Sequence, residues 1–217
     1  MSQAAARTRT RVRPGRRDSR SPARRRLGVA AGLAALIAAG GMAILLTGGG
    51  PLSDTLREIT LPLRHDDIIR QQASDKNLDP ALVAAVIYEE SRFRDQTSHA
   101  GARGLMQITP ATADFIARRT GGTRFVQADL ATPQINIAYG TYYLRYLLDR
   151  YDQNEAPAVA AYNAGHGNVD RWVRSAGGPG EFSVERDIRF PETRAYVEKV
   201  LERRGQYRDH YGSELGL

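Results

Sequence analysis

The chain has 217 residues and a formal net charge of +7, and the positive charge is concentrated at one end. Residues 1–26 hold ten arginines and one aspartate, so the remaining 191 residues carry a net charge of −2. A domain with this balance gives no electrostatic reason to expect nucleic-acid binding, which needs a basic face on the folded part.

Cysteine and histidine, the usual ligands of zinc sites, are absent or few in the chain. The chain has no cysteine, which excludes a disulfide framework and a thiolate metal site. No two of its four histidines have the three- to five-residue spacing of a helical or finger metal site. We therefore expect neither a metal nor a cofactor, and we interpret the histidines as surface or capping residues.

An uncharged, apolar stretch follows the basic segment. Leu27–Gly50 has no charged residue, and up to Leu46 it is almost wholly Leu, Ile, Ala, Val, Met and Gly. This is about the 20 residues needed to cross a bilayer core. The arginines directly before it place the amino end in the cytoplasm by the positive-inside rule. The pattern predicts a basic cytoplasmic tail over 1–26 and a single transmembrane signal anchor over 27–47, with the rest of the chain on the extracytoplasmic side.

A cleaved signal peptide is the alternative to a retained anchor. Such a peptide has a shorter apolar region that ends in a small-residue cleavage site, whereas this one ends in Ile44-Leu45-Leu46-Thr47-Gly48. Arg24-Arg25 before the apolar run also resembles a twin-arginine export signal, but an arginine pair is weak evidence in so basic a tail. We favour the retained anchor.

A mainly α-helical domain follows a short flexible linker over residues 48–58. We expect the domain to cover 59–212 and a tail to cover 213–217. Helical periodicity dominates the domain, and alternating strand patterns are nearly absent. Capping residues, prolines at first helical positions and apolar stripes predict five helices: from Asp79-Pro80 to about Phe93, from Thr109-Pro110 through Ala117, Ile135–Tyr151, Ala156–Asn163, and from Glu192 to about Arg203.

One glutamate is placed as a catalytic acid would be. On a helical wheel, Glu90 lies within about 10° of the centre of the apolar face of the first predicted helix, and Glu89 lies about 90° away. Burial of an ionised carboxylate is costly, so the pKa of Glu90 should be raised, which suits a general acid. The alternative is an ordinary capping contact or an ion pair with Arg94, four residues further on.

Five segments then resemble one enzyme family. They are similar, in order and at about the same spacing, to the motifs of the soluble lytic transglycosylase domain, which belongs to the lysozyme-like superfamily. The resemblance covers about Leu61 to Tyr211, and the segments are E-S-R-F from Glu90, A-G-A-R-G-L-M-Q-I-T-P from Ala100, N-I-x-x-G-x-x-Y-L from Asn136, A-A-Y-N-A-G from Ala160 and F-P-E-T-R-A-Y-V from Phe190.

The resemblance implies a fold and a reaction. The fold would be lysozyme-like and mainly helical, with a groove for peptidoglycan glycan strands. Glu90 would protonate the glycosidic oxygen between N-acetylmuramic acid and N-acetylglucosamine and then, as carboxylate, take the proton of the muramyl C6 hydroxyl. That hydroxyl closes a 1,6-anhydro ring, so one carboxylate suffices where most glycosidases need two.

The resemblance also implies roles for six other residues. Tyr162 would donate its hydroxyl to the Glu90 carboxyl and orient it. The remaining residues would bind the substrate: Asn163 through a hydrogen bond to sugar, Ser91 and Gln107 near the acetamido and lactyl groups, Met106 at the groove wall or in plain packing, and Glu192 as a sugar contact or as a charge at a helix start.

Two departures and two alternative functions stay open. The stretch before Phe190 is one residue longer than in the family and lacks a proline, so Glu185 has no assigned role. His166 faces either substrate or solvent, and we favour solvent. The same bond could be cut by a goose-type lysozyme-like hydrolase, with Asp95 or Asp114 as its second carboxylate. The domain could also be a non-catalytic peptidoglycan-binding scaffold.

Overall fold

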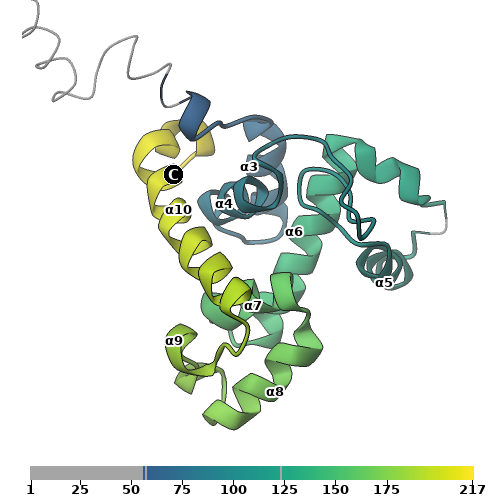
Figure 1. Cartoon of the computed structure of the whole chain (residues 1–217). Helices are drawn as coiled ribbons and strands as arrows, with labels where there is room; N and C mark the ends of the chain where they lie inside the picture. Colours follow the sequence, from purple (N-terminus) through teal and green to yellow (C-terminus); the bar gives the residue numbers. More distant parts are fainter. Residues whose placement is uncertain (1–55, 57, 123) are drawn as a thin grey trace, which may run out of the picture. The chain divides into compact units, whose positions relative to one another are not determined.

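The computed structural model describes residues 56, 58–122 and 124–217 (Figure 1). The predicted tail over 1–26, the predicted anchor over 27–47 and most of the predicted linker lie outside the described residues. Within the part of the chain that is described, no helix is both long enough and apolar enough to span a membrane.

Helices build all of the regular structure in the described residues. In this part of the chain the only β-bridges are two isolated ones, Thr97 to Arg103 and Arg103 to Ile108. This confirms the prediction of a mainly α-helical domain. The helices are α3 (Asp66–Asp75), α4 (Pro80–Ser91), α5 (Pro110–Thr120), α6 (Pro133–Arg150), α7 (Glu155–Ala164), α8 (His166–Ala176), α9 (Val184–Asp187) and α10 (Pro191–Leu215), with short 3₁₀ turns η1 (Gln127–Ala131) and η2 (Pro179–Glu181).

The first two predicted helix starts have the expected caps. The Asp79 side chain accepts a hydrogen bond of 2.9 Å from the backbone N–H of Ala81 at the start of α4. Thr109 accepts one of 3.2 Å from the N–H of Thr112 at the start of α5. Each cap is followed by a proline, whose missing N–H costs nothing at this position.

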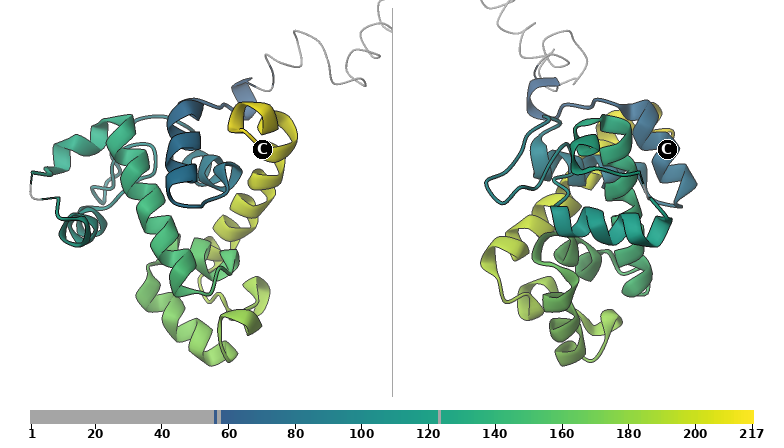
Figure 2. Two further views of the ribbon diagram at one scale, coloured as in Figure 1. Left: turned by 180° about the vertical axis from the view of Figure 1, so that it is seen from behind. Right: turned by 90° about the vertical axis from the view of Figure 1, so that its right-hand side faces the viewer.

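Helix α4 lies at the centre of the fold. Residues 81–87 are all buried, so the helix is enclosed on every side and not only along one face. It packs against α10 and α3. In Figures 1 and 2, α10 runs along one side of α4 and α6 along the other. Helices α7, α8 and α9 lie together at one end of the domain, and residues 58–62 lie at the opposite end. A residue at the end of α4 is therefore surrounded by several elements.

Helix α10 is longer than predicted. It continues past Arg203 to Leu215 with a kink at Tyr211, whose φ and ψ of −133° and 24° are not helical, and the side chains of Tyr207 and Leu215 belong to the hydrophobic core. The Tyr207 hydroxyl donates to the backbone carbonyl of Pro62 at 2.7 Å, which ties the helix to the start of the described chain. The boundary expected at residue 212 therefore falls just after the kink, and 213–215 are helical and follow it rather than forming an unstructured tail.

The loop that follows α4 is held on α6 by one side chain. Asn136 accepts a 2.8 Å hydrogen bond from the backbone N–H of Met106. It donates to the carbonyls of Arg103 and Leu130 at 2.8 and 2.9 Å. Gly140 leaves room for the Met106 side chain, because a Cβ there would collide with its sulfur. The loop that carries Gln107 thus has a fixed place beside the end of α4.

Candidate active site

Glu90 lies in the last turn of α4 and is mostly buried. Burial is the main cause that raises the pKa of its carboxyl to about 7, against the lowering effect of the Tyr196 hydrogen bond and with a smaller raising effect of the Glu89 charge. A group with this pKa is close to half protonated at neutral pH. The raised pKa predicted from the helical wheel is confirmed.

A tyrosine holds this carboxyl in place, and it is not the one expected. The Tyr196 hydroxyl, from the second turn of α10, donates to Glu90 Oε1 at 2.6 Å. Tyr162 donates instead to the backbone carbonyl of Met106 at 3.0 Å. The charge of Glu90 still contributes to the raised pKa of both tyrosines, after burial as the main cause. Both rings therefore lie close to the carboxyl, but the expected hydrogen bond belongs to Tyr196.

The ends of α7 and α10 are joined beside this site. Thr193, buried in the first turn of α10, donates its hydroxyl to Asn163 Oδ1 at 2.7 Å. Asn163 itself is exposed, and its amide nitrogen has no hydrogen-bond partner in the described part of the chain. Thr193 and Tyr196 are three residues apart and so lie on the same face of α10. This face brings α10 against both Glu90 and the A-Y-N-A-G segment.

Three of the expected substrate-binding side chains stabilise the loop that follows α4. Ser91 is buried, and its hydroxyl contacts the carbonyl oxygens of Leu105 at 2.7 Å and Ile87 at 3.2 Å. Gln107 has a positive φ of 47° and donates to the carbonyls of Gln96 and Gly104 at 3.0 and 2.8 Å. The Met106 side chain is fully buried in the core, which agrees with the packing alternative.

Glu192 and His166 lie in different environments. Glu192 is exposed in the first turn of α10, four residues before Tyr196 and so near the same side of the helix. His166 begins α8 and is half-buried, with Nδ1 at 3.4 Å from the Tyr143 hydroxyl. Its ring meets the Tyr146 ring edge-on at 6.2 Å. His166 is thus partly exposed, and the other part of its ring packs against the Tyr143 and Tyr146 side chains.

Among residues 58–122 and 124–217, no second acid is buried beside the Glu90 carboxyl. Glu89 is the one carboxylate whose charge acts on the pKa of Glu90 among the described residues, and it forms an ion pair with Arg203 at 3.4 Å. Asp95 is exposed. Asp114 is exposed too, and it accepts a hydrogen bond from Gln127 at 3.1 Å. The site therefore centres on one buried carboxyl with a tyrosine donor.

Solved structures place this fold among the lytic transglycosylases. The 70 kDa soluble lytic transglycosylase of Escherichia coli matches with a TM-score of 0.66 and 32% identity, over 71% of this chain and 26% of that one. An inactive glutamate-to-glutamine mutant of the lytic transglycosylase Slt from Pseudomonas aeruginosa matches with a TM-score of 0.65 and 30% identity, over 72% and 26%. The fold is the lysozyme-like one that the sequence motifs implied.

Residues 67–183 match the family model described as the transglycosylase SLT domain, and the chain belongs to this family. It is 34% identical over 179 residues to the soluble lytic murein transglycosylase of Escherichia coli strain K12. That match covers 81% of this chain and 28% of the relative, so the chain spans little more than a quarter of the length of this curated relative.

Proposed function

We propose that the chain is a peptidoglycan lytic transglycosylase that cleaves the β-1,4 bond between N-acetylmuramic acid and N-acetylglucosamine. The observation that carries this proposal is the single buried carboxyl of Glu90, with its pKa near 7 and its hydrogen bond from Tyr196. Family membership and the names of the relatives point to the same reaction.

In the first step Glu90 acts as the acid. Its proton passes to the glycosidic oxygen, the bond from that oxygen to the muramyl C1 breaks, and the bonding electrons leave with the oxygen. A pKa close to the working pH keeps a sizeable fraction of the acid protonated and still lets it release its proton readily. Burial provides this, because a solvent-exposed glutamate would be almost fully ionised at pH 7.

In the second step the same carboxylate acts as the base. The muramyl C6 oxygen attacks C1, forms the 1,6-anhydro ring, and gives its proton to Glu90, which returns to its starting state. The nucleophile belongs to the substrate, so no second carboxylate is needed to position water or to form a covalent intermediate. The surroundings of Glu90 match this requirement, since Glu89 is engaged by Arg203.

The neighbouring residues divide into two groups in this proposal. Tyr196 orients the Glu90 carboxyl, and Tyr162 forms the wall beside it. Exposed Asn163 and Glu192 bind sugar hydroxyl or acetamido groups from the ends of α7 and α10, where their polar atoms reach solvent. Ser91, Met106 and Gln107 act on the substrate through the loop that they hold in place.

The proposed location is the outer side of a bacterial membrane, with residues 27–47 as a retained single-pass anchor. The apolar stretch and the arginines before it support this. Relatives named membrane-bound lytic murein transglycosylase also exist, for example form F of Desulfosudis oleivorans, which is 37% identical over 113 residues. That match covers 49% of this chain and 23% of the relative.

Product analysis tests the proposed reaction. The full chain in detergent is incubated with purified peptidoglycan beside Glu90→Gln and the matched control Glu89→Gln, and the released strands are analysed by mass spectrometry. We expect 1,6-anhydro ends from the parent, at least about 100-fold fewer from Glu90→Gln because the acid is lost, and a near-parental yield from Glu89→Gln. Reducing ends would mean a hydrolase, and intact strands would mean a binding scaffold.

A further inference from the structure

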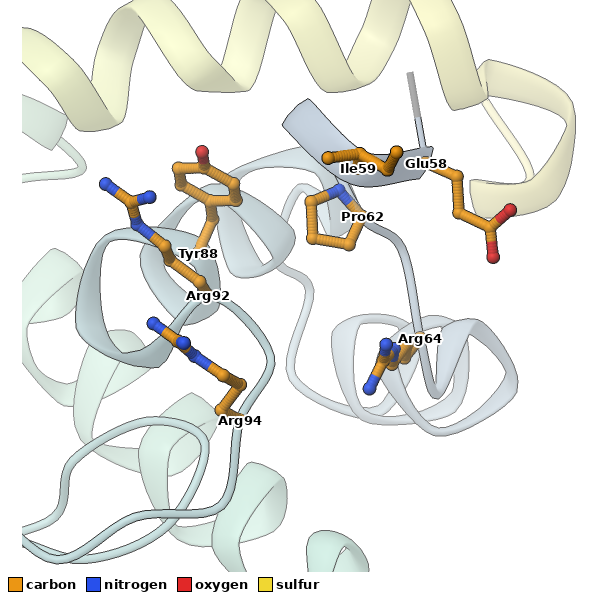
Figure 3. Close-up of a pocket in the computed structure, with 7 residues that line it drawn as sticks. All are labelled: Glu58, Ile59, Pro62, Arg64, Tyr88, Arg92 and Arg94. Atoms are coloured by element: carbon orange, nitrogen blue, oxygen red, sulfur yellow. The ribbon is translucent and has the colours of Figure 1, made fainter. Parts of the chain in front are cut away.

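A hollow lies on the other side of α4 from the catalytic acid. It has a volume of about 390 Å³ and is lined by Glu58, Ile59, Pro62, Arg64, Tyr88, Arg92 and Arg94 (Figure 3). Tyr88 and Glu90 are two residues apart on an α-helix, so their side chains point in directions about 160° apart. The hollow is therefore separate from the site around Glu90, and the proposed reaction does not use it.

Three arginines give this hollow a positive lining. Arg64, Arg92 and Arg94 are exposed, and none of them forms an ion pair with a carboxylate of the described residues. Glu58 is the one acid of the lining. In Figure 3, Arg92 and Arg94 come from the turn after α4, and Arg64 comes from the segment before α3 across the hollow. Arg92 lies over the Tyr88 ring at 5.7 Å but has no carboxylate partner among the residues that the structure describes. Guanidinium groups without carboxylate partners around one hollow suit a phosphate-bearing ligand.

The backbone brings two of these arginines to the same rim. Arg92 and Phe93 have φ angles of 51° and 59°, in the left-handed region that residues with a Cβ adopt at a cost. The turn buries the Phe93 ring, which packs at 6.2 Å from the Tyr207 ring, and leaves Arg92 and Arg94 exposed on either side. The end of a helix favours a cation at Arg92, but this does not account for Arg64, which lies on a different element.

Exposed aliphatic side chains accompany the arginines. Ile59, in the lining, is 72% exposed, and nearby in the sequence Leu56 is 50% exposed. Exposed aliphatic groups beside arginines are typical of surfaces that bind an anionic bilayer, where the apolar groups enter the interface and the cations meet phosphates. Carboxylates of a cell-wall peptide would satisfy the arginines but would leave Ile59 and Leu56 without an apolar partner.

The short distance in sequence between the hollow and the predicted anchor also favours a membrane lipid as the ligand. Ile59 follows the end of the predicted anchor, Thr47, by twelve residues. Even fully extended, such a connection covers only about 40 Å. If residues 27–47 span the membrane, the domain therefore stays within reach of the headgroups of its own bilayer. A weak headgroup site would then be at high effective concentration of its ligand.

We propose that Leu56, Ile59, Arg64, Arg92 and Arg94 form a headgroup-binding face that binds the phosphates of anionic phospholipids on the membrane surface. Since Glu90 projects from the opposite side of α4, lipid contact at this face leaves the catalytic carboxyl directed away from the bilayer. Binding through this face would hold the active site toward the cell wall.

Vesicle co-sedimentation of residues 52–217 tests the proposal without the predicted span. Residues 56–217 form a compact unit with its own hydrophobic core, which is the property of a segment that folds alone. Vesicles are made of phosphatidylcholine, alone or with one third phosphatidylglycerol. We expect binding only to the mixed vesicles, and a loss of about fivefold for each arginine removed, or about 100-fold for Arg64→Gln, Arg92→Gln and Arg94→Gln together.

A matched variant separates this face from general charge. Arg118→Gln, Arg174→Gln and Arg189→Gln together make the same change in net charge at exposed arginines outside the hollow, and we expect these to retain most of the binding. The pair Leu56→Ser and Ile59→Ser, which changes exposed side chains only, should lower binding severalfold with an unchanged unfolding midpoint. This pair gives an answer even if the arginine variant is poorly folded.

Four outcomes would overturn the proposal. Two of them concern the lipid: the parent binds neutral vesicles as well as mixed ones, or 10 mM glycerol phosphate abolishes binding, which would indicate a site for small free phosphates. The other two concern the variants: both arginine triples lose the same amount of vesicle binding, or the Leu56 and Ile59 pair loses none. None of these measurements depends on cleavage of glycan, so their failure and a failure of the proposed reaction are distinguishable.

Discussion

The proton on Glu90 links catalysis to stability. The native state keeps this proton up to about pH 7, whereas an ordinary glutamate releases it near pH 4.5. Between these values the folded state binds more protons than the unfolded state, so the free energy of unfolding falls as the pH rises. By this linkage the loss between pH 4.5 and pH 8 is about 3 kcal/mol at most.

Replacement of the carboxyl should therefore stabilise the protein at alkaline pH. Glu90→Gln keeps an acceptor for the Tyr196 hydroxyl but cannot ionise, so we expect it to exceed the parent in unfolding free energy by about 1–3 kcal/mol at pH 8 and to match it near pH 5. Urea denaturation at both pH values measures this. In Glu89→Gln the Glu90 carboxyl is still present, so its free energy of unfolding should fall with rising pH as it does in the parent. If parent and Glu90→Gln had the same pH dependence of stability, the pKa of Glu90 would not be raised.

The Tyr196 hydroxyl should tune the pH dependence of cleavage. Its hydrogen bond lowers the pKa of Glu90, so Tyr196→Phe should move the loss of activity to higher pH and reduce the rate about tenfold through loss of one hydrogen bond. Tyr162→Phe is the control, since its hydroxyl donates to Met106, and it should leave the midpoint unmoved. The midpoints are measured from the rates of glycan release between pH 5 and 9. If only Tyr162→Phe shifted the midpoint, Tyr162 and not Tyr196 would be the tyrosine that holds the Glu90 carboxyl.

For single residues, the sequence predicts the catalytic acid, Glu90, better than the tyrosine that donates a hydrogen bond to it. The position of Glu90 follows from helical periodicity, which is a local property. Which tyrosine reaches the carboxyl depends on how α7 and α10 pack against α4, and Tyr162 and Tyr196 both stand in motifs that resemble the family. The available signal was the three-residue spacing from Thr193 to Tyr196, which puts both on one helix face, but it did not say which face meets Glu90.

Among the elements, α6 and the loop after α4 should be sensitive to small changes in volume. Gly140→Ala places a methyl group against the buried Met106 side chain and should destabilise the fold by about 1–3 kcal/mol through overpacking. Gly205→Ala, in the middle of α10 with open space around it, should instead stabilise by about 0.5–1 kcal/mol. Thermal unfolding of the two variants checks this, and similar effects of both would show that the Met106 contact does not matter.

The sequence predicts helix starts more reliably than helix ends. Asp79-Pro80 and Thr109-Pro110 mark their helices because capping and proline act locally. The C-terminal half of α10 escapes prediction because Arg203, Arg204 and Gly205 interrupt its apolar pattern. Its ion pairs with other elements, such as those from Arg204 to the carboxylates of Asp79 and Glu155, come from tertiary packing that periodicity does not reveal.

For the whole molecule, the C-terminal part of α10 should be essential. Removal of residues 206–217 exposes the pocket left by Tyr207, Tyr211 and Leu215, all buried, and should cost more than about 4 kcal/mol at 1.5–3 kcal/mol for each buried side chain. Removal of Gly216 and Leu217 alone, where Leu217 is 51% exposed, should cost less than about 1 kcal/mol by the same reasoning. Urea denaturation measures both, and a fully stable 1–205 chain would contradict the role given to this helix.

The source of the attacking oxygen tests the central claim most directly. Peptidoglycan is digested by the full chain in water enriched in oxygen-18, and the new muramyl ends are analysed by mass spectrometry. If the substrate's own C6 hydroxyl closes the ring while Glu90 shuttles the proton, the new ends carry no heavy oxygen and are one water lighter than reducing ends. Incorporation of one oxygen-18 at each cleaved bond would show that water attacks, and would contradict a transglycosylase with Glu90 as its single acid and base.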